Sequence, residues 1–179
     1  MSIIHMGHEY WSLVQAPHES RFGTIAQLKM VCWLEATAVF RDPLPGMYEL
    51  SWRMELPSES STDFHCQWTG TLYDDQHRPL GPSVQYVQPR KPSWSKDVVG
   101  KGWFQISFGR IRISDQQRPS LLEMKLFGGN DMWFRDLKLD YAQCFPVDPS
   151  SSPPPVPSVK LECPSAATSS ESGNTNDSA

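Results

Sequence analysis

Alternation between hydrophobic and polar residues is the main pattern of the chain as far as residue 145. It is clearest in residues 47–56, where the even positions are all hydrophobic: Tyr48, Leu50, Trp52, Met54 and Leu56. A period of two residues is typical of a β-strand with one face toward a core and the other toward solvent. Residues 66–73 and 103–108 show the same period, so we expect a strand at each of these three places.

Residues 31–40 are rich in β-branched and aromatic side chains, contain neither Gly nor Pro, and are hydrophobic at both parities near their start. This composition indicates a strand that is covered on both faces and lies near the middle of the fold. The following Asp-Pro-Leu-Pro-Gly sequence, residues 42–46, is a strong turn signal. It predicts a hairpin between this strand and residues 47–56.

A weaker signal places a strand at residues 83–87, and the pattern predicts two more strands at residues 121–127 and 133–141. Residues 22–30 suit a strand as well as one helical turn, and short hydrophobic runs do not separate the two. We expect Gly109 to form a bulge in its strand, and residues 128–131, Gly-Gly-Asn-Asp, to form a β-turn. About eight short strands with frequent turns predict an all-β fold, an antiparallel β-sandwich of the jelly-roll type.

The alternation also predicts which side chains form the core. We expect the following to be buried: Trp33, Trp52, Phe104, Ile106, Phe108, Leu122, Met124, Leu126, Leu137 and Leu139.

The composition changes after Pro146. Residues 147–179 are rich in Pro and Ser and lack aromatic side chains, so they offer too little apolar surface to offset the entropy lost on ordering. We therefore predict one β-sandwich domain over residues 1–146 and a disordered tail over residues 147–179.

Composition and charge exclude several classes of function. The net charge is −4 and the basic residues are scattered, which disfavours binding to nucleic acid or to an anionic membrane surface. No hydrophobic run reaches the about 20 residues of a membrane span, and residues 1–10 do not resemble a secretory signal. The four cysteines form no CxxC pair, so we expect reduced thiols and a cytoplasmic or nuclear location. The chain has 7 tryptophans, more than a core of this size needs, and we expect some of them on the surface.

Catalytic and metal-binding motifs are missing from the sequence. There is no glycine-rich phosphate loop, nucleophile elbow or HExxH motif, and Asp74-Asp75 lies in a predicted turn, where solvated acids are ordinary. His5, His8 and His18 have no cysteine or carboxylate partners at ligand spacing. We expect neither an enzyme nor a bound cofactor or metal.

Several short blocks, in this order and spacing, resemble the phloem protein 2 family of plants, the domain of Nictaba-type lectins and of many plant F-box proteins. The blocks are Glu9-Tyr10-Trp11, Glu19-Ser20-Arg21-Phe22, Val31-Cys32-Trp33-Leu34-Glu35, Pro45-Gly46-Met47-Tyr48-Glu49-Leu50, Trp103-Phe104 and Trp133-Phe134-Arg135-Asp136-Leu137. The resemblance covers residues 10–145 and implies a β-sandwich.

The lectin members of this family bind N-acetylglucosamine oligomers and N-glycan cores, and the resemblance implies the same ligands for this chain. The sugar is read by tryptophans of the N-terminal segment and by acidic side chains in the turn before the final strand. Carried over by position, Trp11 matches one of these tryptophans and Asp131 matches the acidic turn, and the neighbouring Asn130 has suitable chemistry, so the candidate site residues are Trp11, Asn130 and Asp131. An indole can stack on the C–H face of a sugar ring while amide and carboxylate groups bind its hydroxyls. From the residues alone, burial of Trp11 in the core is the other interpretation.

A second function remains open, because the family's first tryptophan has no counterpart in this chain. The domain would then be a protein–protein interaction or substrate-receptor module without sugar affinity. About ten residues precede Trp11, and we expect this to be too few for an F-box, which consists of several helices.

Overall fold

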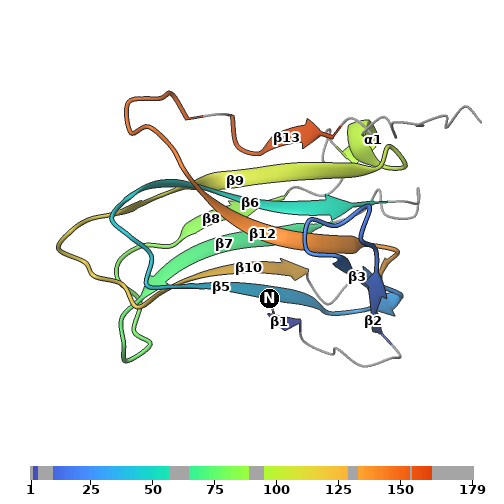
Figure 1. The fold of residues 1–179 in the computed structure, drawn as a ribbon, viewed down its shortest axis with the longest axis horizontal. Helices are drawn as coiled ribbons and strands as arrows, with labels where there is room; N and C mark the ends of the chain where they lie inside the picture. The colour runs from blue at the N-terminus through green and yellow to red at the C-terminus, as the bar shows by residue number, and fades with distance from the viewer. Residues whose placement is uncertain are drawn as a thin grey trace, which may run out of the picture.

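The computed structural model describes residues 2–3, 10–56, 65–88, 95–128, 133–153 and 155–162. Its strands form two large antiparallel sheets, which lie as stacked layers in Figure 1. The predicted all-β sandwich is therefore confirmed. None of the helices in this described part is long and apolar enough to cross a lipid bilayer.

The first layer is a five-stranded sheet in the order β1-β5-β10-β7-β8. Its strands are β1 (Ser2–Ile3), β5 (Leu34–Arg41), β10 (Leu121–Gly128), β7 (Cys66–Tyr73) and β8 (Val84–Val87).

The second layer is a six-stranded sheet in the order β13-β9-β6-β12-β3-β2. Its strands are β13 (Ser158–Leu161), β9 (Trp103–Ile113), β6 (Gly46–Glu55), β12 (Lys138–Pro146), β3 (Thr24–Leu28) and β2 (Trp11–Gln15). A small two-stranded sheet pairs β4 (Met30–Val31) with β11 (Phe134–Arg135), and a single short helix, α1 (Ser95–Val98), is present in the described residues.

The core lies between the two layers, where the alternation predicted it. Leu50, Trp52 and Met54 of β6 are fully buried on one side. Leu122 and Met124 of β10 are fully buried on the other. The predicted core residues other than Trp33 are all buried. All of these except Leu137 lie on the inward parity of a regular strand, and Leu137 lies in the break between β11 and β12.

β9 contains the predicted bulge at Gly109. Leu50 of β6 pairs with Gly109 and Ser51 pairs with Ser107, so Phe108 is the extra residue. A bulge of one residue shifts the inward parity of the strand. Before it the buried positions are even, as at Phe108, and after it they are odd, as at Ile111.

The predicted hairpin between residues 31–40 and 47–56 is wrong. β5 pairs with β1 and β10 in one layer, whereas β6 pairs with β9 and β12 in the other. Residues 42–46 therefore carry the chain from one sheet to the other. The strong turn signal was correct, but it does not specify whether a turn joins neighbours in one sheet or crosses between two layers.

Residues 31–40 are also not one continuous strand. β4 ends at Val31, β5 begins at Leu34, and Cys32 and Trp33 lie between them. Val31 and Leu34 are both buried, three residues apart rather than two, so the chain departs from strand geometry between them. Trp33 consequently falls outside the core, and 44% of its surface is exposed.

The same break occurs in residues 133–141, which were predicted as one strand. Asp136 has a φ of 61° and separates β11 from β12. Phe134 and Leu137 on either side of the break are buried, and Trp133 is 60% exposed. The face predicted to hold Trp133 and Leu137 together is therefore split. Residues 22–30, left undecided between strand and helical turn, contain the strand β3.

Part of the predicted disordered tail is a strand of the sandwich. β13 pairs with β9 through the register Ser158–Ser107 to Leu161–Phe104, and it runs beside β9 in Figure 1. Composition averaged over residues 147–179 conceals this short strand among the prolines. The prediction of disorder is thus corrected for residues 147–153 and 155–162, while residues 163–179 lie outside the described residues.

A buried charge cluster fixes the end of β13 to the sheet. Arg53 Nη2 lies 2.7 Å from Glu162 Oε2, and its guanidinium lies 4.3 Å from the ring centroid of Trp103. Burial alone lowers the pKa of Arg53, but hydrogen bonds and charge from Glu162 and Asp140 outweigh it, and the net pKa is raised. Arg53 is therefore a permanent cation that holds the segment after β13.

Candidate functional site

Trp11, the residue predicted to stack on a sugar, is a core residue. It begins β2, is 2% exposed, and belongs to the same buried cluster as Leu28, Val31 and Phe134. The indole has no face available to a ligand, so the assignment of Trp11 as a binding residue is corrected. The burial that the sequence left open as the other interpretation is the one observed.

Asn130 and Asp131, the other two predicted site residues, lie outside the described residues, as does the turn predicted there. Their role in binding stays a prediction. The described chain resumes at Trp133, which is largely exposed.

The structure instead places other aromatic side chains around a small pocket. Its lining consists of Tyr10, Val31, Cys32, Trp33 and Trp133, and its volume is about 170 Å³. We call this the aromatic pocket. Tyr10 is 42% exposed, Trp33 44% and Trp133 60%, so each of these three rings presents part of its surface to solvent. The expectation that some tryptophans lie on the surface is confirmed.

The pairing of β4 with β11 brings the two tryptophans together. Val31 pairs with Phe134 in this small sheet. Trp33 follows Val31 by two residues and Trp133 directly precedes Phe134. The pairing of Val31 with Phe134 therefore places the backbone of both tryptophans close together. The backbone N–H of Lys29 donates to the carbonyl of Tyr10 over 2.8 Å. This bond holds Tyr10, the third aromatic residue of the pocket, beside the segment that leads into β4. The two irregular breaks in the strand pattern thus form the pocket.

A neighbouring ring orients Trp33. Its centroid lies 5.8 Å from that of Phe127, with the planes at 88°. Edge-to-face contacts of this kind are favourable and directional. The contact holds the indole while part of it remains exposed, which is the condition for stacking on a ligand without a large entropy loss.

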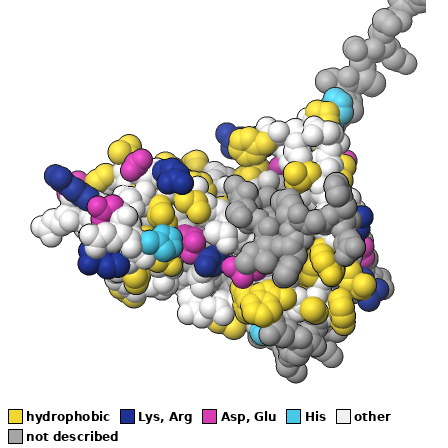
Figure 2. Space-filling model, turned by 90° about the horizontal axis from the view of Figure 1, so that it is seen from below, with side chains coloured by type: hydrophobic (Ala, Val, Ile, Leu, Met, Phe, Trp, Pro, Cys, Tyr) yellow, Lys and Arg dark blue, Asp and Glu magenta, His cyan; other side chains and the backbone are white. Residues whose placement is uncertain are grey.

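Hydrophobic side chains are conspicuous on the surface at this end of the molecule. Figure 2 shows a group of them in its lower right part, whereas charged side chains dominate the left end. Met30, next to the pocket residue Val31, is itself 45% exposed. Exposed apolar groups gathered in one place commonly mark a binding surface.

Acidic and cysteine side chains elsewhere have structural explanations. Asp74 accepts hydrogen bonds from the backbone N–H groups of Arg78 and Gln76. The bond from the Arg78 backbone is the largest cause of its lowered pKa. Asp74 therefore stabilises a turn, as expected from its position.

The described cysteines are free thiols. Burial raises the pKa of Cys66 strongly and that of Cys144 to about 11, so neither is a ready nucleophile at neutral pH. Within the described residues, no group of three or more His, Cys, Asp or Glu side chains converges on one point.

Sequence reasoning missed Trp33 and Trp133 because it treated both as strand residues. One signal was available in the sequence. Val31 and Leu34, like Phe134 and Leu137, are hydrophobic at a spacing of three, and no continuous strand can bury both members of such a pair on one face. Burial of both members on one side therefore requires a break in the strand between them. Trp33 lies in the first break, and Trp133 lies next to Phe134, before the second.

Comparison with known proteins gives one family and several structures. The family model described as Phloem protein 2 matches residues 1–139. No curated protein matches the sequence.

Among solved structures, the enzymatically active domain of tailspike protein 4 of bacteriophage CBA120 is similar, with a TM-score of 0.51 and 11% identity. The match covers 82% of this chain and 19% of that one. At this identity the similarity concerns the fold alone.

Two further structures align with lower TM-scores. TmCBM61, solved in complex with beta-1,4-galactotriose, has a TM-score of 0.41 and 12% identity, over 82% of this chain and 86% of that one. A structure from work on carbohydrate-binding modules of the beta-sandwich superfamily has a TM-score of 0.42 and 10% identity, over 75% and 53%.

Proposed function

Because this chain belongs to the phloem protein 2 family, we propose that it is a non-catalytic carbohydrate-binding module. The single observation that carries the proposal is the pair of part-exposed indoles, Trp33 and Trp133, in one small pocket. Part-exposed indoles gathered in one place form an apolar surface of the kind that binds ligands, and a sugar ring offers a C–H face of matching shape.

The size of the aromatic pocket limits what enters it. A volume of about 170 Å³ is below the about 300 Å³ at which pockets for whole drug-sized ligands begin. It suits one ring or one substituent of a longer ligand. The acetamido group of N-acetylglucosamine has a methyl group for the apolar lining and an amide for hydrogen bonding. We infer that N-acetylglucosamine oligomers, including the core of N-glycans, are the ligands.

Asn130 and Asp131 keep their proposed role as polar partners of the sugar. Asp131 precedes Trp133 by two residues, so covalent geometry limits the distance between their Cα atoms to about 7 Å. An amide and a carboxylate have the donors and acceptors that ring hydroxyls require.

Titration with chitotriose, followed by nuclear magnetic resonance of the indole N–H groups, tests the proposal. The signals of Trp33 and Trp133 should shift, and Trp133→Ala should weaken binding at least about tenfold because a stacking ring is lost. Leu44→Ala is the matched control, since Leu44 is a 73% exposed hydrophobic residue remote in sequence from the pocket residues. It should bind like the native chain. Absence of any shift at about 1 mM chitotriose contradicts the proposal.

The second candidate is a protein–protein interaction module that uses the same surface. The observation that favours it is the apolar character of the pocket and of the neighbouring Met30. Aromatic and methionine side chains are enriched at protein interfaces. If chitotriose leaves both indole signals unmoved, a photo-cross-linker at position 133 should give one specific protein adduct, and Met30→Asp should abolish it.

We also propose that the protein acts in the cytoplasm or nucleus. The observation behind this is that Cys32, Cys66 and Cys144 are free, as is usual for reduced compartments. Microscopy of the fluorescently tagged protein in plant cells tests this, and accumulation in the secretory pathway would contradict it.

A further inference from the structure

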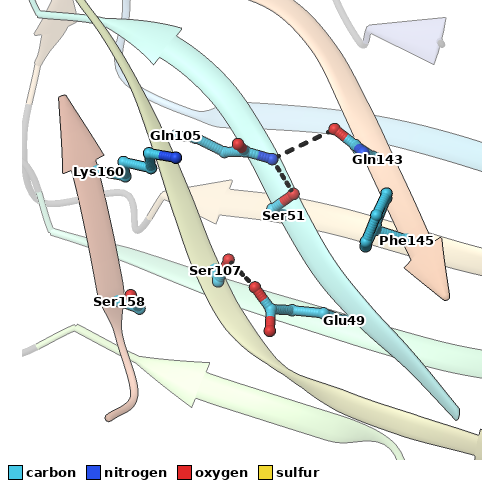
Figure 3. A pocket seen from close by; sticks show the side chains of 8 residues that line it. All are labelled: Glu49, Ser51, Gln105, Ser107, Gln143, Phe145, Ser158 and Lys160. Carbon is cyan, nitrogen blue, oxygen red and sulfur yellow. Dashed lines mark hydrogen bonds between the residues drawn. The ribbon is translucent and has the colours of Figure 1, made fainter. Parts of the chain in front are cut away.

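A second hollow lies on the outer face of the six-stranded sheet and shares no residue with the aromatic pocket. Its volume is about 340 Å³, twice that of the pocket. Figure 3 shows the side chains that line it: Glu49, Ser51, Gln105, Ser107, Gln143, Phe145, Ser158 and Lys160. We call this hollow the serine trough, and it comprises side chains of β6, β9, β12 and β13.

The strand register explains its shape. Gln143, Ser51, Ser107 and Ser158 lie in one row across the four neighbouring strands. Three of these four side chains are serines, so the row forms a low floor. Neighbouring strands are about 4.8 Å apart, so the row from β12 to β13 is about 14 Å long. The hollow is therefore elongated and crosses the strands.

Larger side chains form the two walls. On one side Gln105 pairs with Lys160 in the next row, and on the other Phe145 pairs with Glu49. Phe145 is 55% exposed. It gives an otherwise polar trough one flat apolar surface.

Internal hydrogen bonds hold the floor in place. Gln105 Nε2 donates to Ser51 Oγ over 2.7 Å and to Gln143 Oε1 over 3.3 Å. On the other side, Ser107 Oγ donates to Glu49 Oε1 over 2.7 Å. Figure 3 shows that the bond from Gln105 to Gln143 reaches from β9 across β6 to β12, whereas the other two bonds join the neighbouring strands β9 and β6. The polar groups are thus arranged before any ligand arrives, which lowers the entropic cost of binding.

Donors and acceptors remain available along the trough. Within the described part of the chain, the hydroxyl of Ser158, the ammonium of Lys160 and the Nε2 group of Gln143 have no bonding partner. Amides and hydroxyls both donate and accept. A ligand with closely spaced hydroxyls and ether oxygens along its length satisfies such a lining.

The charges favour an uncharged ligand. Glu49 is neutralised by Arg110, with Oε2 3.5 Å from Nη2, and Lys160 is the remaining charge of the lining. One cation is too few for a nucleic acid, whose binding depends on several phosphate contacts. A peptide is disfavoured because the face of a sheet offers no free backbone groups for strand pairing.

We propose that the serine trough is a second ligand site, which binds an uncharged oligosaccharide chain with one ring against Phe145. The trough makes the domain bivalent: the aromatic pocket takes one ring or substituent, and the trough takes a run of several sugars. Two weak sites on one domain raise the apparent affinity for a glycan surface without any new contact.

Side-chain signals in nuclear magnetic resonance separate the two sites in one experiment. The indole N–H groups of Trp33 and Trp133 report the aromatic pocket, and the side-chain amides of Gln105 and Gln143 report the trough. Chitotetraose and cellotetraose are the probes, because they share their linkage and differ in the acetamido group. We expect at least one of them to shift the two glutamine amides.

Variants then assign those shifts. Phe145→Ala combined with Ser158→Trp removes the apolar wall and fills the floor, so it should weaken the binding reported by the glutamine amides at least about tenfold. The indole shifts should be unchanged. Leu13→Ala is the matched control, because Leu13 is a 60% exposed hydrophobic residue of the same sheet on β2. It should alter neither set of shifts.

The outcomes distinguish failure of this proposal from failure of the proposed function. Indole shifts without glutamine shifts overturn the trough and leave the aromatic pocket standing. Glutamine shifts without indole shifts overturn the aromatic pocket as a sugar site and support the trough. A Ser/Asn-rich decapeptide is a control ligand. If it shifts the glutamine amides and neither tetrasaccharide does, the assignment of the trough to an oligosaccharide is overturned.

Discussion

The guanidinium of Arg53 and the carboxylate of Asp140 form a buried ion pair, with Nη1 2.5 Å from Oδ2. The Asp140 side chain is fully buried, and its other oxygen accepts a hydrogen bond of 2.5 Å from the hydroxyl of Ser20. The pair joins β6 to β12 and to the loop after β2. With Glu162 it also ties β13 to the sheet.

Replacing Asp140 by Asn should lower the free energy of unfolding by about 3–5 kcal/mol. The cost arises because a buried Arg53 loses its closest anion while its desolvation remains. Glu162→Gln is the matched control, because that carboxylate is 35% exposed, and it should cost no more than about 1 kcal/mol. Urea unfolding of both variants measures the difference. Equal losses would show that burial does not determine the strength of this cluster.

A chain that ends after Pro153 should be less stable than one that ends after Glu162. It loses the pairing of β13 with β9 and the contact of Arg53 with Glu162. We expect a loss of about 1–3 kcal/mol, the contribution of a few net hydrogen bonds and one partly exposed ion pair. Thermal unfolding of the two chains side by side provides the measurement. Identical melting temperatures would mean that β13 contributes nothing to the sandwich.

Replacement by Ala should destabilise the fold to different extents at two tryptophans. Trp52→Ala should cost about 3–5 kcal/mol, because the ring is fully buried between the sheets. Trp33→Ala should cost about 1 kcal/mol, since its indole is part-exposed and loses mainly the contact with Phe127. Chemical denaturation of both variants tests the ranking. The reverse order would place Trp33 in the core after all.

Gly70 is close-packed against the opposite sheet, and Gly70→Ala should destabilise the fold by about 1–3 kcal/mol. A Cβ atom there would lie 2.3 Å from Cδ1 of Leu50. Since that atom is the cause, the effect should shrink when Leu50 is already Ala, giving a non-additive double-mutant cycle. Strict additivity would indicate that Gly70 is needed for its backbone rather than for space.

Alkylation should be pH-dependent at Cys144. Burial raises the pKa of its thiol to about 11, so its thiolate fraction rises about tenfold per pH unit up to that value. The exposed Cys32 should react first with iodoacetamide at pH 8, as peptide mass spectrometry would show. Prompt modification of Cys144 at that pH contradicts the assignment.

The same shift affects stability. A thiol with a raised folded pKa stabilises the fold below its ordinary pKa of about 8.5, and that contribution is lost as the pH rises toward 11. The urea midpoint of the native chain should therefore fall over this range. The urea midpoint of the Cys144→Ala variant should fall less over the same pH range.

Regular strands were predictable from sequence, and irregular ones were not. The alternation in β6, β7 and β9 has a period that only one local structure satisfies, so even the bulge at Gly109 was found. Trp33 and Trp133 were misplaced because each was assigned to a continuous strand, whereas the first strand is interrupted at residues 32–33 and the second at residues 136–137. Whether these two side chains are buried or exposed depends on the pairing of β4 with β11. That pairing joins residues about a hundred positions apart in the chain.

The candidate sites were less predictable than the fold for a related reason. The serine trough requires the register of β12, β6, β9 and β13 to bring small side chains into one row. No segment of the sequence contains that row. Family resemblance suggested a sugar site near the N-terminal segment, but it assigned the site to Trp11, which the sandwich buries.

The position of β10 between β5 and β7 determines when this sheet can form during synthesis of the chain. β5 and β7 are synthesised early, yet both pair with β10, whose last residue is Gly128. Until then their inner edges have no partner, and unpaired edges readily join other chains. We therefore expect the nascent protein to depend on chaperones until this strand has emerged, and to fold slowly for its size once it has.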